Sequence, residues 1–278
     1  MKKTSIGNPH VASPYVVWSA IFIIVPLIMV AYYSFTDEGG NFTLNNIAKI
    51  VEYNYLKIFG TSILYAFVAT VITLLISFPL AYFMTKTKVS TQGTLMLLVM
   101  LPMWMNLLIR TYSLSNILER NGIINTFLET IGLEKVQLIN TPGAVILGMI
   151  YNFIPYMILP IYSILSKLDN RLLEAASDLG ANGKTTLLKV ILPLSMPGIV
   201  SGITMVFVPS VSTFYISQKL GGIHNELIGD VIEQQFKLNS NYNIGATLSL
   251  VLMVMIIISL AIMNRFTADD DGGMIIWR

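Results

Sequence analysis

Long apolar runs separated by polar segments are the main pattern of the chain. Each run is close to the roughly 20 residues that an α-helix needs to cross the hydrocarbon core of a bilayer. The six runs are Pro14–Ser34, Ser62–Met84, Gly93–Ile109, Pro142–Leu165, Gly198–Ile216 and Asn243–Met263. The first ends without a signal-peptidase cleavage pattern, so we expect it to remain as a span. The pattern therefore predicts an all-α, polytopic membrane protein with six transmembrane helices.

The polar segments between the runs are too short to fold as separate domains, because the longest has only about 30 residues. We therefore expect one membrane domain over residues 1–278. Residues 111–141 are predicted to form an external connection with short helices, and residues 217–242 a polar external loop. Any energy source or soluble recognition domain must then come from other chains.

Composition agrees with this class and excludes several functions. Hydrophobic residues make up 54% of the chain and charged residues 12%, whereas about a quarter of a typical soluble domain is charged. The formal net charge of +2 is too small to indicate a nucleic-acid partner. The absence of cysteine excludes a disulfide framework and a cysteine nucleophile. Because His10 and His224 are far apart in sequence, we expect no metal site.

The distribution of Lys and Arg predicts the orientation of the spans. Six spans leave both termini on one side, and the side richer in Lys and Arg faces the cytoplasm. The terminal side holds ten of the 17, at positions 2, 3, 86, 88, 167, 171, 184, 189, 265 and 278. We therefore expect cytoplasmic termini. On the opposite side, Arg110 is expected to snorkel to the interface, and Glu226, Asp230 and Glu233 to be solvated loop charges.

The segment between spans four and five, Lys167–Pro197, is the longest charge-rich stretch on the predicted cytoplasmic side. Asp169 or Asn170 can cap a helix that Gly180 ends at its C′ position. The apolar face of this helix is predicted to comprise Leu172, Leu173, Ala176 and Leu179.

A second short helix is predicted to follow the glycine. Asn182 can cap a helix over Gly183–Ile191, and Pro193 is expected to end it. From periodicity alone, a helix pair lying on lipid headgroups is as good an interpretation as a docking site for a partner. The start of this helix looks like the end of a phosphate-binding loop, but the glycine required five residues before Gly183 is Asp178. We therefore favour a helix–turn–helix over a nucleotide-binding enzyme.

Spaced positions in this segment resemble a family motif. Glu174-Ala175-Ala176, three residues, Gly180, nine residues and Val190-Ile191-Leu192-Pro193 resemble the EAA loop, EAA-x3-G-x9-I-x-L-P, of the inner-membrane permeases of bacterial ABC importers. The single departure is Val190, where the pattern has Ile. The resemblance implies a type I ABC importer permease fold, with cytoplasmic coupling helices between spans four and five. The residues that it assigns to ATPase coupling are Glu174, Ala175, Ala176, Asp178, Gly180, Leu192 and Pro193.

Two further stretches, Pro102–Tyr112 and Gly221–Phe236, are similar to spermidine/putrescine permeases, in particular to their B-type subunit. The resemblance implies a polyamine importer permease that works by alternating access in the bacterial inner membrane. It implies as partners two ABC ATPase subunits, a second and homologous permease, and an extracellular polyamine-binding protein. Under this resemblance the chain is not an enzyme and binds no cofactor, because ATP and Mg belong to the ATPase.

The predicted spans hold aromatic and amide side chains rather than fixed charges. An ammonium group could pass such walls by cation–π contacts of about 0.5–2 kcal/mol each. The candidates for this translocation path are Trp104, Asn106, Tyr151, Asn152, Tyr156, Ser210, Thr213, Phe214 and Tyr215. Interhelical hydrogen bonding and interfacial packing are alternative roles for each.

Two other functions remain open at the level of sequence. One is a permease of the same family for sulfate, molybdate, iron or phosphonate. The other is an ATP-independent channel or carrier, which predicts acidic residues buried in the membrane or repeated broken helices.

Overall fold

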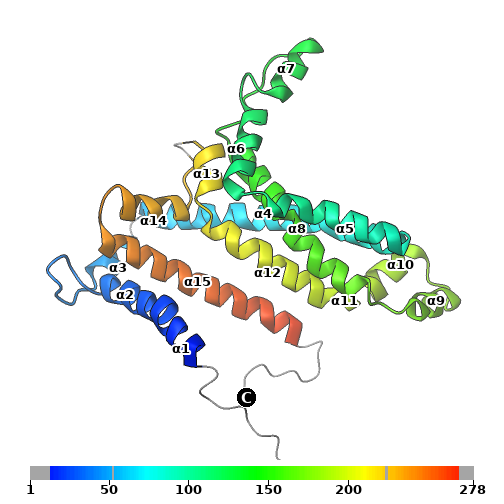
Figure 1. Cartoon of the computed structure of the whole chain (residues 1–278), viewed down its shortest axis with the longest axis horizontal. Helices are drawn as coiled ribbons and strands as arrows, with labels where there is room; N and C mark the ends of the chain where they lie inside the picture. The colour runs from blue at the N-terminus through cyan, green and yellow to red at the C-terminus, as the bar shows by residue number, and fades with distance from the viewer. Residues whose placement is uncertain (1–12, 52, 223–224, 269–278) are drawn as a thin grey trace, which may run out of the picture. The chain divides into compact units, whose positions relative to one another are not determined.

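The computed structural model describes residues 13–51, 53–222 and 225–268 of the chain (Figure 1). Within these residues the structure is helical, and its only β pairing is an isolated bridge between Thr36 and Phe42. The predicted all-α class is therefore confirmed. Contacts between residues divide the chain into two compact units, Met1–Leu56 with Val231–Val254 and Lys57–Asp230 with Met255–Arg278.

Four helical stretches of the described residues are long and apolar enough to cross a membrane by themselves. They are Pro14–Ser34, Asn54–Lys86, Pro142–Leu165 and Tyr242–Met263. Two further candidates are bent pairs, Val89–Trp104 with Leu107–Thr130 and Gly183–Leu194 with Met196–Ser212. The six predicted spans are reached when each bent pair counts as one, and the protein is a multi-pass membrane protein.

The first unit is held together near its loops by asparagine side chains. It contains α1 (Ser13–Ser19), the π-helical turn η2 (Ala20–Ile24), α2 (Val25–Ser34), α3 (Asn45–Ile50), most of α14 (Ile228–Lys237) and the start of α15 (Tyr242–Ala268). Asn46 donates to the carbonyl oxygens of Ser34 (3.3 Å) and Thr36 (2.8 Å). Asn243 donates to the same carbonyl of Thr36 at 2.6 Å, so the loop after α2 is tied to both α3 and α15.

The second unit is built around the packing of α8 against α12. It contains the start of α14, the end of α15 and most of α4 (Tyr53–Lys86). Its other helices are α5 (Val89–Trp104), α6 (Leu107–Leu118), α7 (Ile123–Thr130), α8 (Pro142–Leu165), α9 (Asn170–Asp178), α10 (Gly183–Thr186), the π-helical turn η3 (Leu187–Ile191), α11 (Leu192–Leu194), α12 (Met196–Ser212) and α13 (Tyr215–Leu220). A Cβ at Gly198 would lie 2.8 Å from the carbonyl oxygen of Pro160, and one at Gly202 would lie 2.6 Å from Met157 Sδ. The two glycines, four residues apart, therefore permit this close approach.

We predicted one span over the third apolar run, Gly93–Ile109, but this run is not one straight helix. The helix ends at Trp104, and α6 leaves at an angle of 93°. Met105 and Asn106 have extended backbone angles, and the side chain of Asn106 accepts the N–H of Leu108 at 2.7 Å. Asn106 thus starts a new helix as an N-cap inside a run that hydrophobicity alone reads as continuous.

The fifth run also ends earlier than predicted, at Ser212 instead of Ile216. Thr213 is extended, and α13 begins at Tyr215. The hydroxyl of Ser212 donates to the carbonyl of Val208 at 3.1 Å, and such side-chain bonds compete with the helical ladder. The described residues of 217–242 are then not the polar loop that we predicted, because Leu220, Leu227 and Ile228 are fully buried.

Two charged residues lie inside the second unit, contrary to the sequence prediction. Arg110 is only 4% exposed because α6 packs against α8 and α13, so it does not snorkel. Asp230 is 1% exposed and is not a solvated loop charge. Its carboxylate accepts the N–H of Leu227 at 2.7 Å, and Ser62 accepts the neighbouring N–H of Ile228 at 2.8 Å. Asp230 therefore stabilises the start of α14, as the residue at position N3 of a capping box does.

Candidate functional site

The segment Lys167–Pro197 forms a helix, a turn and a second helix. The carboxylate of Asp169 accepts the N–H of Arg171 at 3.0 Å and caps α9. The side chain of Asn182 accepts the N–H of Thr185 at 2.9 Å and caps α10. Both predicted caps are therefore confirmed. They could be predicted from sequence because each joins residues only two or three positions apart.

The turn between the two helices depends on Gly180, whose φ is +79°. Its N–H bonds to the carbonyl of Ser177 at 2.9 Å, and the next N–H, of Ala181, bonds to the carbonyl of Ala176 at 3.0 Å. This pair of bonds is a Schellman motif, and its positive φ favours glycine. The predicted stop at Gly180 is therefore confirmed.

The second helix continues past its predicted end. α10 passes into η3 and then into α11, so Pro193 lies within the helical path instead of ending it. In η3 the N–H of Leu192 bonds to the carbonyl of Leu187, five residues back, and Pro193 follows in the first turn of α11, where its missing N–H is tolerated. The path bends by 66° between Leu194 and Met196.

The residues of the EAA motif divide between a packed and an open side. Ala176 is buried and Leu192 is half-buried. The exposed members are Glu174, Ala175, Asp178, Gly180 and Pro193. The open side of α9 therefore combines small residues, which permit close approach of a partner, with carboxylates that can form ion pairs.

Leu179 is an exposed residue of this segment that the sequence analysis assigned to the apolar face. Its side chain is 88% exposed, and Leu172 is also exposed, so only Leu173 and Ala176 of the predicted face pack inward. Leu179 is the C-cap of α9, where the chain turns away from the packed side. The position of Leu179 directly before the helix-ending Gly180 is the sequence signal that could have predicted its exposure. A large apolar side chain here suits contact with another protein.

The candidate path residues do not share one environment. Asn152, Ser210 and Thr213 are buried. Asn152 donates to the hydroxyl of Thr111 (3.2 Å) and to the carbonyl of Gly148 (2.9 Å), which is the interhelical role that we weighed against a path. Tyr156 and Tyr215 are half-buried, whereas Trp104, Asn106, Tyr151 and Phe214 are exposed.

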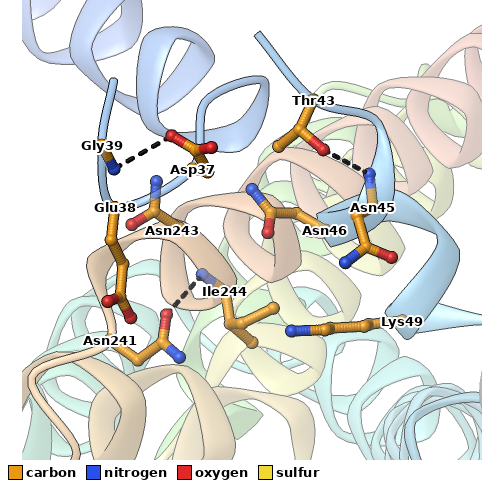
Figure 2. Close-up of a pocket in the computed structure, with 10 residues that line it drawn as sticks. All are labelled: Asp37, Glu38, Gly39, Thr43, Asn45, Asn46, Lys49, Asn241, Asn243 and Ile244. Atoms are coloured by element: carbon orange, nitrogen blue, oxygen red, sulfur yellow. Dashed lines mark hydrogen bonds between the residues drawn. The ribbon is translucent and has the colours of Figure 1, made fainter. Parts of the chain in front are cut away.

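A separate polar pocket of about 400 Å3 lies in the first unit (Figure 2). Figure 2 shows Asp37 and Glu38 on one side and Lys49 on the other, with the amides of Asn46 and Asn243 between them. The N–H groups of Asn41 (2.8 Å) and Gly39 bond to the carboxylate of Asp37.

These hydrogen bonds, that of Asn41 above all, hold the pKa of Asp37 below its usual value. Asp37 therefore stays ionised at neutral pH. No group of three or more His, Cys, Asp or Glu that could hold a metal ion occurs among the described residues, while His10 and His224 lie outside them.

Comparison with known protein sequences shows one consistent resemblance. The family model described as "binding-protein-dependent transport system inner membrane component" matches residues 77–268. The spermidine/putrescine transport system permease protein PotB of Haemophilus influenzae is 39% identical over 256 residues, covering 89% of this chain and 90% of that one. PotB of Escherichia coli is 36% identical over 245 residues, covering 85% and 89%.

Solved structures show the same fold at low sequence identity. A bacterial ABC transporter that imports alginate matches with a TM-score of 0.79 at 15% identity, over 92% of this chain and 93% of that one. The same kind of transporter in complex with a periplasmic protein carrying an alginate pentasaccharide matches with a TM-score of 0.81 at 14% identity, over 95% of both chains. The predicted type I ABC importer permease fold is therefore confirmed.

Proposed function

The chain belongs to the family of binding-protein-dependent transport system inner membrane components, and from this premise we propose that it is the permease subunit of an ATP-driven importer of polyamines. The observation that carries the proposal is the 39% identity to a spermidine/putrescine permease across 89% of the chain. The likeness to the alginate transporters, at 15% identity, concerns the fold alone and does not favour an acidic polysaccharide.

We propose that the segment Lys167–Pro197 receives the ATPase. Its open side offers carboxylates at Glu174 and Asp178 and an apolar contact at Leu179, which together suit a mixed polar and apolar cleft. Because the turn at Gly180 fixes the angle between α9 and α10, a partner that grips α9 also moves α10 and the start of α12. ATP and Mg then act in the partner, and this chain performs no catalysis.

The rest of the assembly follows from the same family. The chain is expected to work with two ATPase subunits, a second and homologous permease, and an extracellular polyamine-binding protein. The periplasmic protein in one of the similar alginate transporter structures supports the last of these partners. The bias of Lys and Arg supports cytoplasmic termini, which would place Lys167–Pro197 on the side of the ATPase.

The substrate path remains a proposal. Trp104, Tyr151 and Phe214 expose aromatic surface, and an ammonium group can bind such rings weakly enough to leave again. Buried Asn152 and Ser210 serve packing in the present structure, so we expect the exposed aromatic residues to contribute more to the path.

Uptake into liposomes tests the function directly. The chain is reconstituted with its ATPase, second permease and binding protein, and radiolabelled spermidine uptake is measured with ATP inside the vesicles. We expect spermidine uptake to need both ATP and the binding protein. Unlabelled putrescine should reduce this uptake by competition, whereas sulfate and molybdate should not. Uptake without ATP would support the channel or carrier alternative instead.

A charge reversal tests the docking surface. Glu174→Lys should lower spermidine uptake and the stimulation of ATPase activity by the loaded binding protein, because it places a cation where the partner meets a carboxylate. Glu134→Lys, at another exposed glutamate of the second unit, is the matched control. Normal uptake in Glu174→Lys would show that the ATPase docks elsewhere.

A further inference from the structure

One glutamine side chain joins the ends of three helices in the second unit. Gln92 lies in the first turn of α5 and donates through Nε2 to the carbonyl oxygens of Thr85 (3.2 Å) and Thr87 (3.0 Å), at the end of α4. Its Oε1 accepts the O–H of Tyr162 in α8 at 2.9 Å. A single amide therefore connects the α4–α5 turn to the last turn of α8.

The chemistry of the partners permits only this orientation of the amide. The two carbonyl oxygens can only accept, so Nε2 must face them, and Oε1 then meets the O–H of Tyr162. The carbonyls come from the last turn of α4 and the residue after it, where helical N–H partners run out. Gln92 thus uses both of its N–H groups and its oxygen, and we call Gln92 with Tyr162 the latch.

The latch borders a cavity of about 240 Å3 that separates the α4–α5 turn from the coupling segment. Its lining includes Tyr82, Lys86 and Gln92 from α4 and α5, and Leu168, Leu173 and Ile191 from the coupling side. This unfilled space weakens the packing between the coupling segment and the α4–α5 turn.

The coupling segment shares one apolar core with the end of α8 and with Met84 of α4. Ile191 of η3 and Leu165 of α8 are buried in the same apolar core, and Leu173 of α9 packs against that core. A displacement of α9 and η3 is therefore passed to the end of α8. From there, the bond between Tyr162 and Gln92 is a direct polar connection to α5 and α4.

We propose that Gln92 and Tyr162 are positioning residues that transmit movement of the coupling helices to α4 and α5, an inference that rests on the proposed function. With the latch intact, α8 and the α4–α5 turn move as one body when the ATPase closes. With the latch broken, only apolar packing joins α8 to the α4–α5 turn. The turn then follows α8 less closely, so ATP is hydrolysed while fewer substrate molecules cross per ATP.

The test measures coupling in the complete reconstituted importer. Tyr162→Phe removes one O–H and keeps the ring, whereas Gln92→Leu removes all three hydrogen bonds and keeps the bulk. In each variant, the number of spermidine molecules imported per ATP hydrolysed should fall about two- to tenfold, the range that loss of one interhelical hydrogen bond spans. ATPase activity stimulated by the loaded binding protein should persist. The double variant should fall no further than Gln92→Leu, because the two groups form one connection.

Tyr65→Phe is the matched control. Tyr65 is a half-buried tyrosine of α4 whose O–H donates to the amide oxygen of Asn225 at 3.4 Å, so the substitution deletes the same kind of bond away from the coupling segment. Its ratio of substrate to ATP should stay unchanged. The proposal is overturned if the latch variants keep the normal ratio, or if Tyr65→Phe lowers the ratio as much as they do.

A readout without substrate separates this inference from the proposed function. The chain has no cysteine, so Ser90→Cys in α5 and Ser163→Cys in α8, both exposed, can be spin-labelled in a complex whose other subunits are cysteine-free. With the latch intact, the distribution of distances between the two labels should stay narrow, and its mean should not change when ATP binds. Gln92→Leu should broaden this distribution or shift its mean. A distribution that Gln92→Leu leaves unchanged contradicts the latch. Failure of the unmodified importer to take up polyamine would instead contradict the proposed function and leave this measurement valid.

Discussion

Helices α7 and α9 end in the same way but belong to different surfaces. Gly132 follows α7 with φ +82°, and Gly180 follows α9 with φ +79°. In both, the N–H of the next residue bonds to the carbonyl five residues earlier, at 2.9 Å after α7 and 3.0 Å after α9. The two turns are therefore nearly identical in backbone chemistry, so any difference in their roles must come from what surrounds them.

The chain after each turn follows a different course. After α7 it folds back on itself, because the fully buried Asn125 donates to the carbonyls of Glu119 (3.1 Å) and Val136 (3.0 Å) and accepts the N–H of Val136 (2.8 Å). After α9 it continues directly into a second helix capped by Asn182. The first turn closes a local hairpin, whereas the second fixes the angle between two helices.

The exposed faces of the two helices also differ. On α7 and its C-cap, Ile123, Phe127 and Ile131 are exposed at spacings of four residues and form an apolar stripe. On α9, the exposed residues include Glu174 and Asp178. A helix-ending glycine therefore identifies a turn, and only the surrounding surface distinguishes a coupling site from another exposed helix.

The largest effect should come from placing valine at each glycine. Gly180→Val and Gly132→Val force a β-branched residue to positive φ, which costs about 1–3 kcal/mol at either position, and no neighbouring atom lies within 4 Å of either Cβ. Only Gly180→Val changes the angle between the coupling helices. We expect ATP-driven spermidine uptake to fall at least about tenfold in Gly180→Val and to remain near normal in Gly132→Val.

Thermal unfolding of both purified variants provides the control for this pair. The decrease in melting temperature should be similar, because the backbone strain is similar. Equal losses of uptake would break the comparison, since the effect would then follow strain in general instead of the docking geometry.

The next largest effect is expected at Gly198, where the space for a Cβ atom, and not the backbone angle φ, limits substitution. At Gly198 a Cβ would lie 2.8 Å from a backbone oxygen of α8, so Gly198→Ala should destabilise the α8–α12 pair by about 1–3 kcal/mol. Gly93, in α5, has no atom within 4 Å of its Cβ position. Gly93→Ala should therefore keep or slightly raise the melting temperature in detergent. A stable Gly198→Ala protein would show that α12 can move away from α8 without cost.

A smaller and local effect is expected from Asn125→Ala. It removes two hydrogen bonds to Val136, and because Val136 is half exposed to water this should cost only about 0.5–1.5 kcal/mol of local stability. Hydrogen exchange should become faster in residues 133–137, with spermidine uptake nearly unchanged. A loss of uptake as large as that of Gly180→Val would show that the α7 hairpin also takes part in transport.

The smallest effect should come from Asp37→Asn in the first unit. The amide oxygen can accept the same N–H groups of Asn41 and Gly39, so the turn should persist. Because hydrogen bonding lowers the pKa of Asp37, the contribution of its carboxylate is present at neutral pH and is lost only as the pH falls through that lowered value. We expect no change in uptake or melting temperature from this residue between about pH 5 and 8. A change in uptake or melting temperature with pH in this range would contradict the expectation if it disappears in Asp37→Asn.

Much of the candidate site was predictable from sequence because its geometry is local. The caps at Asp169 and Asn182 and the turn at Gly180 each involve residues at most five positions apart. Periodicity did not predict the exposure of Leu179, because it treats Leu179 as part of the helix, whereas α9 ends at Asp178. The path through Pro193 was also missed, because a π-helical turn has no marked sequence signal.

The membrane class, the helical content and the helix–glycine–helix segment follow from the sequence by itself, because hydrophobic length, caps and positive φ are properties of neighbouring residues. Only the tertiary structure decided that Arg110 and Asp230 are buried. These outcomes depend on which distant helices cover a residue. For the same reason the latch between Gln92 and Tyr162, 70 positions apart, could be found only in the folded chain.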